Sequence, residues 1–312
     1  MPPRSPLPQR LGLDPAWMRT PDRDPSRPEP WPTMGAWLED RLSEFIDVPA
    51  FLAEERFVYE AGTPAAASDP YRPHTFVWFH RDLREEASVP GQIHIVHRDE
   101  RIVVIDKPPF LSTLPRGRHV QQSVVVRLRD ELGLPELSPL HRLDRVTSGL
   151  LMLATEKRWR APYQSMFQRG EVAKTYRALA PDRADLEFPI TVRNHLIKQR
   201  GQMQADVDPD APANAESVIE RESVLGADAI YRLTPTTGRT HQLRMHMWGL
   251  GIPISGDPLY PVVRGIAVDD FAHPLQLLAS DVDFVDPIDG SPRQFESVRE
   301  LPLQSEAGGP AA

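Results

Sequence analysis

The sequence contains no cysteine at all. Disulfides, thiolate nucleophiles, cysteine-ligated zinc and iron–sulfur clusters are therefore excluded, so any chemistry must use oxygen or nitrogen groups. Long apolar runs are also missing, since none approaches the roughly 18 to 20 residues that a membrane helix needs. The proline-rich N-terminal segment lacks the apolar stretch of a signal peptide. These absences predict a cytoplasmic protein that does not bind membranes.

Four common catalytic and nucleotide-binding motifs are absent as well. The sequence has no G-x-x-x-x-G-K-[ST], no G-x-G-x-x-G beside an expected strand, no H-E-x-x-H and no G-x-S-x-G. Nucleotide-binding, zinc-protease and ordinary serine-hydrolase functions therefore lose support. With no ligand motif in view, we expect a protein that needs neither a metal ion nor an organic cofactor.

The composition is that of a soluble globular protein, with 40% hydrophobic and 26% charged residues over 312 positions. This length predicts two domains. The net charge of -8 disfavours a nucleic-acid partner, because polyanions bind where Lys and Arg neutralise phosphates. Residues 101–180, however, carry 14 Lys and Arg against 7 Asp and Glu, a local charge of +7 that leaves -15 for the rest. A basic face on an acidic protein is therefore possible.

The chain divides into regions of different composition. Residues 1–33 contain ten prolines and no apolar periodicity, which predicts an irregular arm. Residues 34–90 combine helical spacing of apolar positions with a strand-like alternation over residues 74–79, as in a small α+β domain. We expect residues 91–305 to form the large domain and residues 306–312 a flexible tail.

Strands outnumber helices in the expected large domain. Ser123 and Thr240 are candidate N-caps for two helices that stop at Gly133 and Gly249, and residues 157–169 form a third helix. The expected strands lie at residues 102–105, 150–155, 173–180, 217–225 and 229–238. Few helices separate the later strands, which favours an α+β fold with a mixed or antiparallel sheet over a doubly wound one.

One segment concentrates charge beside an expected strand. HRLDRVTSGLLMLA, residues 141–154, places Asp144 between Arg142 and Arg145 in a loop that leads into a buried strand. Taken alone, an aspartate between arginines is more often a surface ion pair than a catalytic group. The pattern HRLD-x-x-TSGLL-x-LA, however, resembles the signature of the RluA-type pseudouridine synthases, including the two-residue spacer between Asp144 and Thr147.

Further blocks extend this resemblance in the order in which the family has them. They are DKPP at 106–109, KTYRAL at 174–179, TGRTHQLRMHM at 237–247 and GDPLY at 256–260. The resemblance implies a pseudouridine synthase fold, with a mixed, largely antiparallel central sheet flanked by helices and loops. It implies the isomerisation of a uridine in ribosomal or transfer RNA, in which uracil is detached from C1′, rotated and rejoined through C5.

The resemblance also assigns three catalytic residues. Asp144 matches the family's catalytic aspartate, and breaking a glycosidic bond without water needs one such carboxylate in a dry pocket. It would attack the nucleotide or remove the C2′ proton, and the sequence leaves both routes open. Arg239 matches the family's active-site arginine and would supply the charge that keeps a buried carboxylate ionised. Tyr176 matches the active-site tyrosine, which would stack on the uracil and is a candidate to take the C5 proton.

The target uridine must leave its stack to reach such a pocket. Arg142 matches a family arginine near the flipped nucleotide, where it would fill the vacated place or contact a phosphate. The other residues expected to bind RNA are Arg145, Lys174, His241 and Arg244. We expect His141 to brace the loop by a hydrogen bond, and Thr147, Ser148 and Gly149 to shape the turn after Asp144. No nucleophile elbow surrounds Ser148, so it is not a hydrolase nucleophile.

Two departures from the family pattern stand out. Leu278 occupies a late-strand position where relatives commonly have histidine, which puts polar contacts of that strand in doubt. Residues 34–90 have the length and place of an S4 RNA-binding domain but are acidic and lack a basic helix, so we expect a degenerate S4-like or accessory domain. We expect an RNA partner and a monomer.

Two other functions compete with that of a synthase. A non-catalytic RNA-binding or ribosome-assembly protein with the same fold is disfavoured because all three catalytic matches are intact. A carboxylate-dependent hydrolase or glycosidase needs a second carboxylate as partner, and no paired acidic motif is present.

Overall fold

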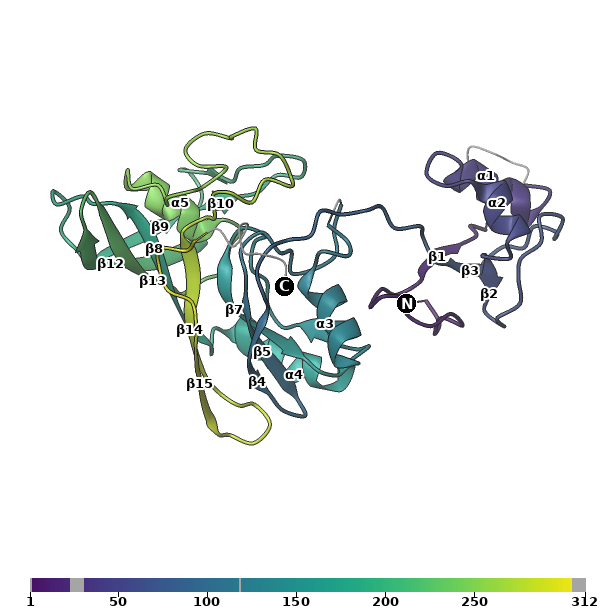
Figure 1. Ribbon diagram of the computed structural model, residues 1–312, viewed down its shortest axis with the longest axis horizontal. Coiled ribbons are helices and arrows are strands. Elements are labelled where there is room, and N and C mark those ends of the chain that lie inside the picture. Colours follow the sequence, from purple (N-terminus) through teal and green to yellow (C-terminus); the bar gives the residue numbers. More distant parts are fainter. Residues whose placement is uncertain (1, 23–30, 118, 305–312) are drawn as a thin grey trace, which may run out of the picture. The chain divides into compact units, whose positions relative to one another are not determined.

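The computed structural model describes residues 2–22, 31–117 and 119–304 (Figure 1). The chain forms two compact units, one up to Glu85 and one from Glu86 onward. The expected tail at 306–312 and residues 23–30 of the expected arm lie outside the described residues.

The first unit is a small α+β body. It contains the strands β1 (Ala16–Arg19), β2 (Val58–Tyr59) and β3 (Phe76–Phe79) and the helices α1 (Met34–Leu42) and α2 (Val48–Ala53). The strands pair antiparallel in the order β1-β3-β2. Thr33 and Asp47 cap the two helices by accepting hydrogen bonds from Ala36 and Ala50.

The prediction of an irregular arm is wrong for residues 16–19. These four residues lie between Pro15 and Pro21 and pair with β3 along its full length. An edge strand needs hydrogen bonds on one side only, so a short segment between prolines suffices. Sequence periodicity over four residues is too short to reveal such a strand.

The second unit is built on a ten-stranded sheet with the order β4-β5-β7-β14-β8-β13-β12-β9, to which β6 adds beside β7 and β15 beside β14. Its strands are β4 (His94–Arg98), β5 (Ile102–Lys107), β6 (Ser138–Pro139), β7 (Ser148–Ala154), β8 (Ala173–Pro181), β9 (Ile190–Asn194), β12 (Ala215–Leu225), β13 (Asp228–Pro235), β14 (Leu277–Val285) and β15 (Pro292–Glu296). A separate hairpin pairs β10 (Leu196–Ile197) with β11 (Asp206–Val207). Of the described strand pairs in this sheet, only β7 with β14 is parallel, which confirms the mixed, largely antiparallel sheet.

Three helices, α3 (Val124–Leu132), α4 (Lys157–Arg169) and α5 (Gln242–Gly249), pack on this sheet (Figure 1). In β5, Val103 and Ile105 join the apolar cluster of α3, while Ile102 and Val104 join that of α4. Because both faces are covered, the strand is a continuous apolar run rather than an alternating one. Helix α5 packs with β8, β12 and β13 in a cluster of its own.

The helix ends agree with the sequence in part. Gly133 ends α3 in the left-handed region with φ 64°, and Ser123 is the N-cap as predicted, although its hydroxyl donates to the carbonyl of Val120 and makes no capping hydrogen bond. The predicted cap Thr240 is wrong, because His241 is the N-cap of α5 and adopts φ 60°. Across the described ranges, no helix is long and apolar enough to cross a bilayer.

The parallel pairing of β7 and β14 joins the two halves of the sheet. It consists of Leu278 opposite Ser148 and Ala279 opposite Gly149. Gly149 has φ 105°, and a Cβ there would lie 2.2 Å from the carbonyl oxygen of Ala279. Glycine is therefore required where the loop that carries Asp144 enters the sheet. Leu278, the late-strand residue that departs from the expected pattern, is buried.

Candidate active site

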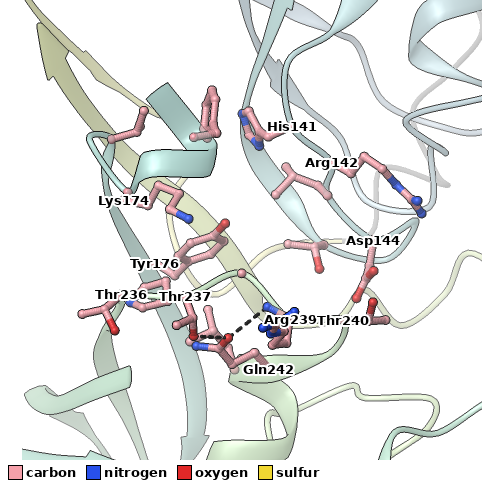
Figure 2. A pocket seen from close by; sticks show the side chains of 18 of the residues that line it. His141, Arg142, Asp144, Lys174, Tyr176, Thr236, Thr237, Arg239, Thr240 and Gln242 are labelled. Atoms are coloured by element: carbon pink, nitrogen blue, oxygen red, sulfur yellow. Dashed lines mark hydrogen bonds between the residues drawn. The ribbon is translucent and has the colours of Figure 1, made fainter. Parts of the chain in front are cut away.

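A cavity of about 1250 Å³ opens where the two halves of the sheet meet. Its walls come from residues 139–144 and Thr147, from the end of α4 and the start of β8, and from residues 234–244 (Figure 2). Its lining includes Asp144 and Tyr176, two of the expected catalytic residues. Side chains from blocks far apart in the sequence therefore line one cavity.

Asp144 lies in the loop before β7, and the turn there closes with a 3.1 Å hydrogen bond from the Thr147 amide to the Asp144 carbonyl. Its side chain is 32% exposed. One carboxylate oxygen, Oδ2, lies 3.5 Å from Arg244 Nη1 and 3.7 Å from His241 Nε2. Among the described residues, no hydrogen bond engages Oδ1, so that oxygen is available to a substrate.

Arg244 is the cation beside Asp144, and it is held firmly. Its Nε and Nη2 donate to Asp257 Oδ2 and Oδ1 at 2.8 and 2.6 Å. Asp257 Oδ1 also accepts from the amides of Leu259 and Tyr260. Burial alone lowers the pKa of Arg244, but its bonds to Asp257 raise that pKa above its ordinary value. The guanidinium therefore stays charged and keeps one edge directed at Asp144.

The prediction that Arg239 supplies the charge beside Asp144 needs correction. Arg239 Nε donates to the carbonyl of Asn214 at 3.1 Å, and its amide donates to Gln242 Oε1 at 3.0 Å (Figure 2). Arg239 lines the cavity as part of the turn before α5. Arg244, five residues later and inside α5, lies beside Asp144 in the place expected for Arg239.

Tyr176 stands on β8, on the opposite side of the cavity from Asp144 (Figure 2). In the sheet it pairs with Ala279 of β14 and Leu233 of β13. Burial, with the charge of Asp144 adding to it, raises the pKa of Tyr176 to about 12. The phenol therefore enters any reaction as a neutral group that presents its ring and one hydrogen to the cavity.

His141 braces the loop that carries Asp144. Its Nε2 accepts a 3.1 Å hydrogen bond from the amide of Met152, and its ring stacks on Phe167 with centroids 4.7 Å apart. Burial, followed by the nearby charge of Lys174, lowers the pKa of His141 to about 3. The imidazole is neutral, and its remaining hydrogen is on Nδ1.

The other expected RNA-binding residues divide into two groups. Arg142 is exposed and Lys174 half-buried, and both line the cavity (Figure 2). Burial lowers the pKa of Lys174. Arg145 is not in the lining, and its guanidinium donates instead to the carbonyls of Phe110 and Val268 at 3.3 and 3.4 Å. Arg145 therefore links the loops that contain Phe110 and Val268 and does not line the cavity.

Within the TSG turn, Thr147 lines the cavity and is nearly buried. Ser148 is fully buried, and its Oγ has no hydrogen-bond partner among the described residues. A buried hydroxyl with no adjacent base cannot act as a nucleophile.

Sequence reasoning missed two residues that support the site. Lys107 is fully buried and donates to the carbonyls of Pro108, Leu111 and Arg145. Burial lowers the pKa of Lys107 to about 7. Asp257, which fixes Arg244, is the second. Their signal was present in the blocks DKPP and GDPLY, where a charged residue stands beside proline in an otherwise apolar stretch.

Comparison with known proteins identifies the family. The family model described as RNA pseudouridylate synthase matches residues 101–248. The dual-specificity RNA pseudouridine synthase RluA of Yersinia pestis is 30% identical over 214 residues, which are 66% of this chain and 99% of that protein. This chain belongs to the RluA-type RNA pseudouridine synthase family.

Other members of the family differ in length. The human pseudouridylate synthase RPUSD2 is 35% identical over 182 residues, which are 57% of this chain, so the chain spans about a third (32%) of that relative. The solved structure of human RNA pseudouridylate synthase domain containing 1 has a TM-score of 0.53 at 22% identity, and the match covers 70% of this chain and 94% of that one. The family fold is thus shared. Within the described ranges, no group of three His, Asp or Glu side chains is placed to hold a metal ion.

Proposed function

We propose that this protein isomerises uridine to pseudouridine in ribosomal or transfer RNA, with Asp144 at the reaction centre. The observation that carries the proposal is the carboxylate of Asp144, whose Oδ2 faces Arg244 while Oδ1 is open to the cavity. Family membership supports the reaction class, since relatives are named as RNA pseudouridine synthases.

In the proposed reaction, the bond between N1 and C1′ breaks, a bond between C5 and C1′ forms, and the C5 proton leaves while N1 gains one. Asp144 Oδ1 starts the reaction by attacking the nucleotide or by removing the C2′ proton. Arg244 keeps the carboxylate ionised, as an adjacent cation does in a water-poor site. Because Tyr176 has a pKa of about 12, its first role is to stack on the uracil as a neutral group rather than to act as a ready base.

The charge of the cavity favours RNA as the partner, although the whole chain is acidic. Its lining includes Arg142, Lys174 and Arg239, which pair with no carboxylate among the described residues, whereas its single carboxylate, Asp144, faces Arg244. Cations of this kind neutralise phosphates near the target. The exposed Arg142 at the rim would fill the place of the flipped uridine or contact its phosphate. An RNA-contacting role for residues 34–90, a monomeric state and a cytoplasmic location stay predictions from the sequence.

Pseudouridine has the mass of uridine but a free N1–H, which allows selective chemical derivatisation. We would compare derivatised RNA from the parent strain, a strain lacking the gene, and that strain complemented with wild type or Asp144→Asn. The expected result is one or a few sites lost on deletion and restored by wild type alone. If no site changes in any RNA fraction while the protein is expressed, the non-catalytic RNA-binding function becomes the better conclusion.

The purified protein gives a second test. Asp144→Asn should lose turnover while its affinity for RNA stays nearly unchanged, because phosphate contacts supply binding and one carboxylate supplies the chemistry. Asp210→Asn is the matched control, since Asp210 is exposed and outside the cavity lining. Turnover by Asp144→Asn at the level of this control would remove Asp144 from the reaction centre.

A further inference from the structure

His241 combines an unusual backbone with a buried side chain. Its φ of 60° lies in the left-handed region, where a residue with a Cβ is strained. The side chain is only 10% exposed and lies between two partners. Its Nδ1 is 2.9 Å from Tyr260 Oη, and its Nε2 is 3.7 Å from Asp144 Oδ2. Strain of this kind persists where surrounding contacts hold it, often at functional sites.

The hydrogen bonds of Tyr260 decide which nitrogen of His241 carries the hydrogen. The amide of Ala205 donates to Tyr260 Oη at 2.7 Å. Burial raises the pKa of Tyr260, so the phenol keeps its single hydrogen. Among the described residues, Nδ1 of His241 is the only hydrogen-bond acceptor near that hydroxyl. A buried hydroxyl hydrogen left without an acceptor is costly, so Tyr260 donates to Nδ1.

The remaining hydrogen of His241 is therefore on Nε2. Burial lowers the pKa of His241 to about 4, with Asp144 and Asp257 opposing that effect and Arg244 and Lys198 adding to it. A neutral imidazole has one N–H, and because Nδ1 accepts, that N–H is at Nε2. It faces the same carboxylate oxygen of Asp144 that Arg244 approaches.

Tyr260 is itself firmly placed. Its amide donates to Asp257 Oδ1 at 3.1 Å, and its ring lies 5.5 Å from that of Trp248. The guanidinium of Arg244 stands over the same ring at 5.2 Å. One hydroxyl of fixed position thus sets the orientation of the His241 ring.

We propose that His241 is a positioning residue for Asp144: its Nε2–H, fixed by Tyr260, holds Oδ2 together with Arg244 and leaves Oδ1 directed at the nucleotide. This role rests on the proposed function of the site. The distance of 3.7 Å is longer than a hydrogen bond, and such contacts tighten when a substrate closes the site.

Two substitutions at His241 separate this role from that of a helix cap. The amide of glutamine reaches the place of Nε2, whereas that of asparagine reaches only the place of Nδ1. Left-handed backbone favours asparagine over glutamine. If His241 only shapes the turn, His241→Asn should be at least as active as His241→Gln. If it positions Asp144, kcat should fall about 10- to 100-fold in His241→Asn, the effect of losing a hydrogen bond to a charged group. Because glutamine keeps a donor at the place of Nε2, the kcat of His241→Gln should stay within about threefold of wild type. KM should be unchanged in both variants.

Tyr260→Phe provides an independent check. It should lower kcat in the wild-type background. Added to His241→Gln, it should have little further effect on kcat, because the glutamine amide has no tautomers for Tyr260 to select. Melting temperatures of all variants are measured alongside, so that loss of folding is recognised. Equal kcat for the asparagine and glutamine variants, or a lower kcat for glutamine, would overturn the proposal.

The tautomer is measurable in wild-type protein without any turnover. In ¹⁵N spectra of histidine-labelled protein, with His241 assigned by its absence from His241→Gln, we expect a protonated Nε2 and a bare Nδ1. Tyr260→Phe should give a mixture of the two tautomers. A protonated Nδ1 in wild type refutes the positioning role even if the protein makes pseudouridine. If the protein shows the expected tautomer but makes no pseudouridine, the proposed function of the site is contradicted instead.

Discussion

Replacing Asp257 tests how strongly its buried pair with Arg244 holds the site together. The carboxylate is 1% exposed and accepts four hydrogen bonds, two of them from Arg244 and the others from the amides of Leu259 and Tyr260. Asp257→Asn keeps one oxygen for the two amides but turns an NH₂ group toward Arg244 Nε. Breaking a buried ion pair from one side costs about 3 to 5 kcal/mol.

Asp257→Ala should be less stable still, because the two amides lose their acceptor at about 1 to 3 kcal/mol each. Urea unfolding of both variants measures the free energy of unfolding. Asp185→Asn is the matched control, since Asp185 makes the same two-pronged contact with Arg183 on the surface, where ion pairs contribute little. If Asp257→Asn unfolds at the same urea concentration as this control, the buried pair does not stabilise the site as argued. Turnover should fall in both Asp257 variants, because Arg244 is released from its position.

Three further outcomes follow from buried groups. Gly149→Ala should lower the free energy of unfolding by about 2 to 5 kcal/mol, because of the positive φ and because the new methyl group would overpack against Ala279. A variant with the melting temperature of the wild type would contradict the close approach of Gly149 to Ala279. Burial lowers the pKa of His246 to about 4, so its stabilisation is complete above the unfolded pKa of about 6.5 and is lost as pH falls, at up to about 1.4 kcal/mol per pH unit. Urea unfolding at several pH values should show a shallower acid loss for His246→Gln, and equal slopes would refute the assignment. Burial lowers the pKa of Lys107 to about 7, so the free energy of unfolding of the wild type should rise between a pH of about 7 and the unfolded-state pKa of about 10.4. Lys107→Met should lack this rise. A rise of equal size in that variant would exclude Lys107 as its source.

Local elements of the fold were predictable because their signals are local. Helix α4 begins at Lys157 and ends at Arg169, as predicted. The apolar run of β7 predicted a buried strand, and all seven of its residues are buried. Strand β1 was missed because its stability comes from β3, almost 60 residues later in the chain. No window of a few residues contains that information.

The candidate site shows the same division. Asp144 and Tyr176 were predicted, because each stands in a block whose letters identify it, and both line the cavity. Arg239 and Arg244 stand in one block, five residues apart, and nothing in the letters says which one faces Asp144. The left-handed turn at His241 and the return of the chain through Asp257 decide it. Both are tertiary features that appear only when distant segments meet.

The junction between β7 and β14 has a mechanical consequence. These strands share two residue pairs, whereas β5 with β7 and β8 with β14 share six each. Asp144 belongs to one side of this narrow seam, and Tyr176 on β8 and Arg244 on α5 belong to the other. Because two residue pairs resist tilting less than six do, a tilt of one side against the other would occur at this seam and leave the longer ladders intact. Such a tilt would alter the gap between Asp144 and Arg244. Substitutions along the seam should therefore change the reaction rate even though they touch neither the carboxylate nor the RNA.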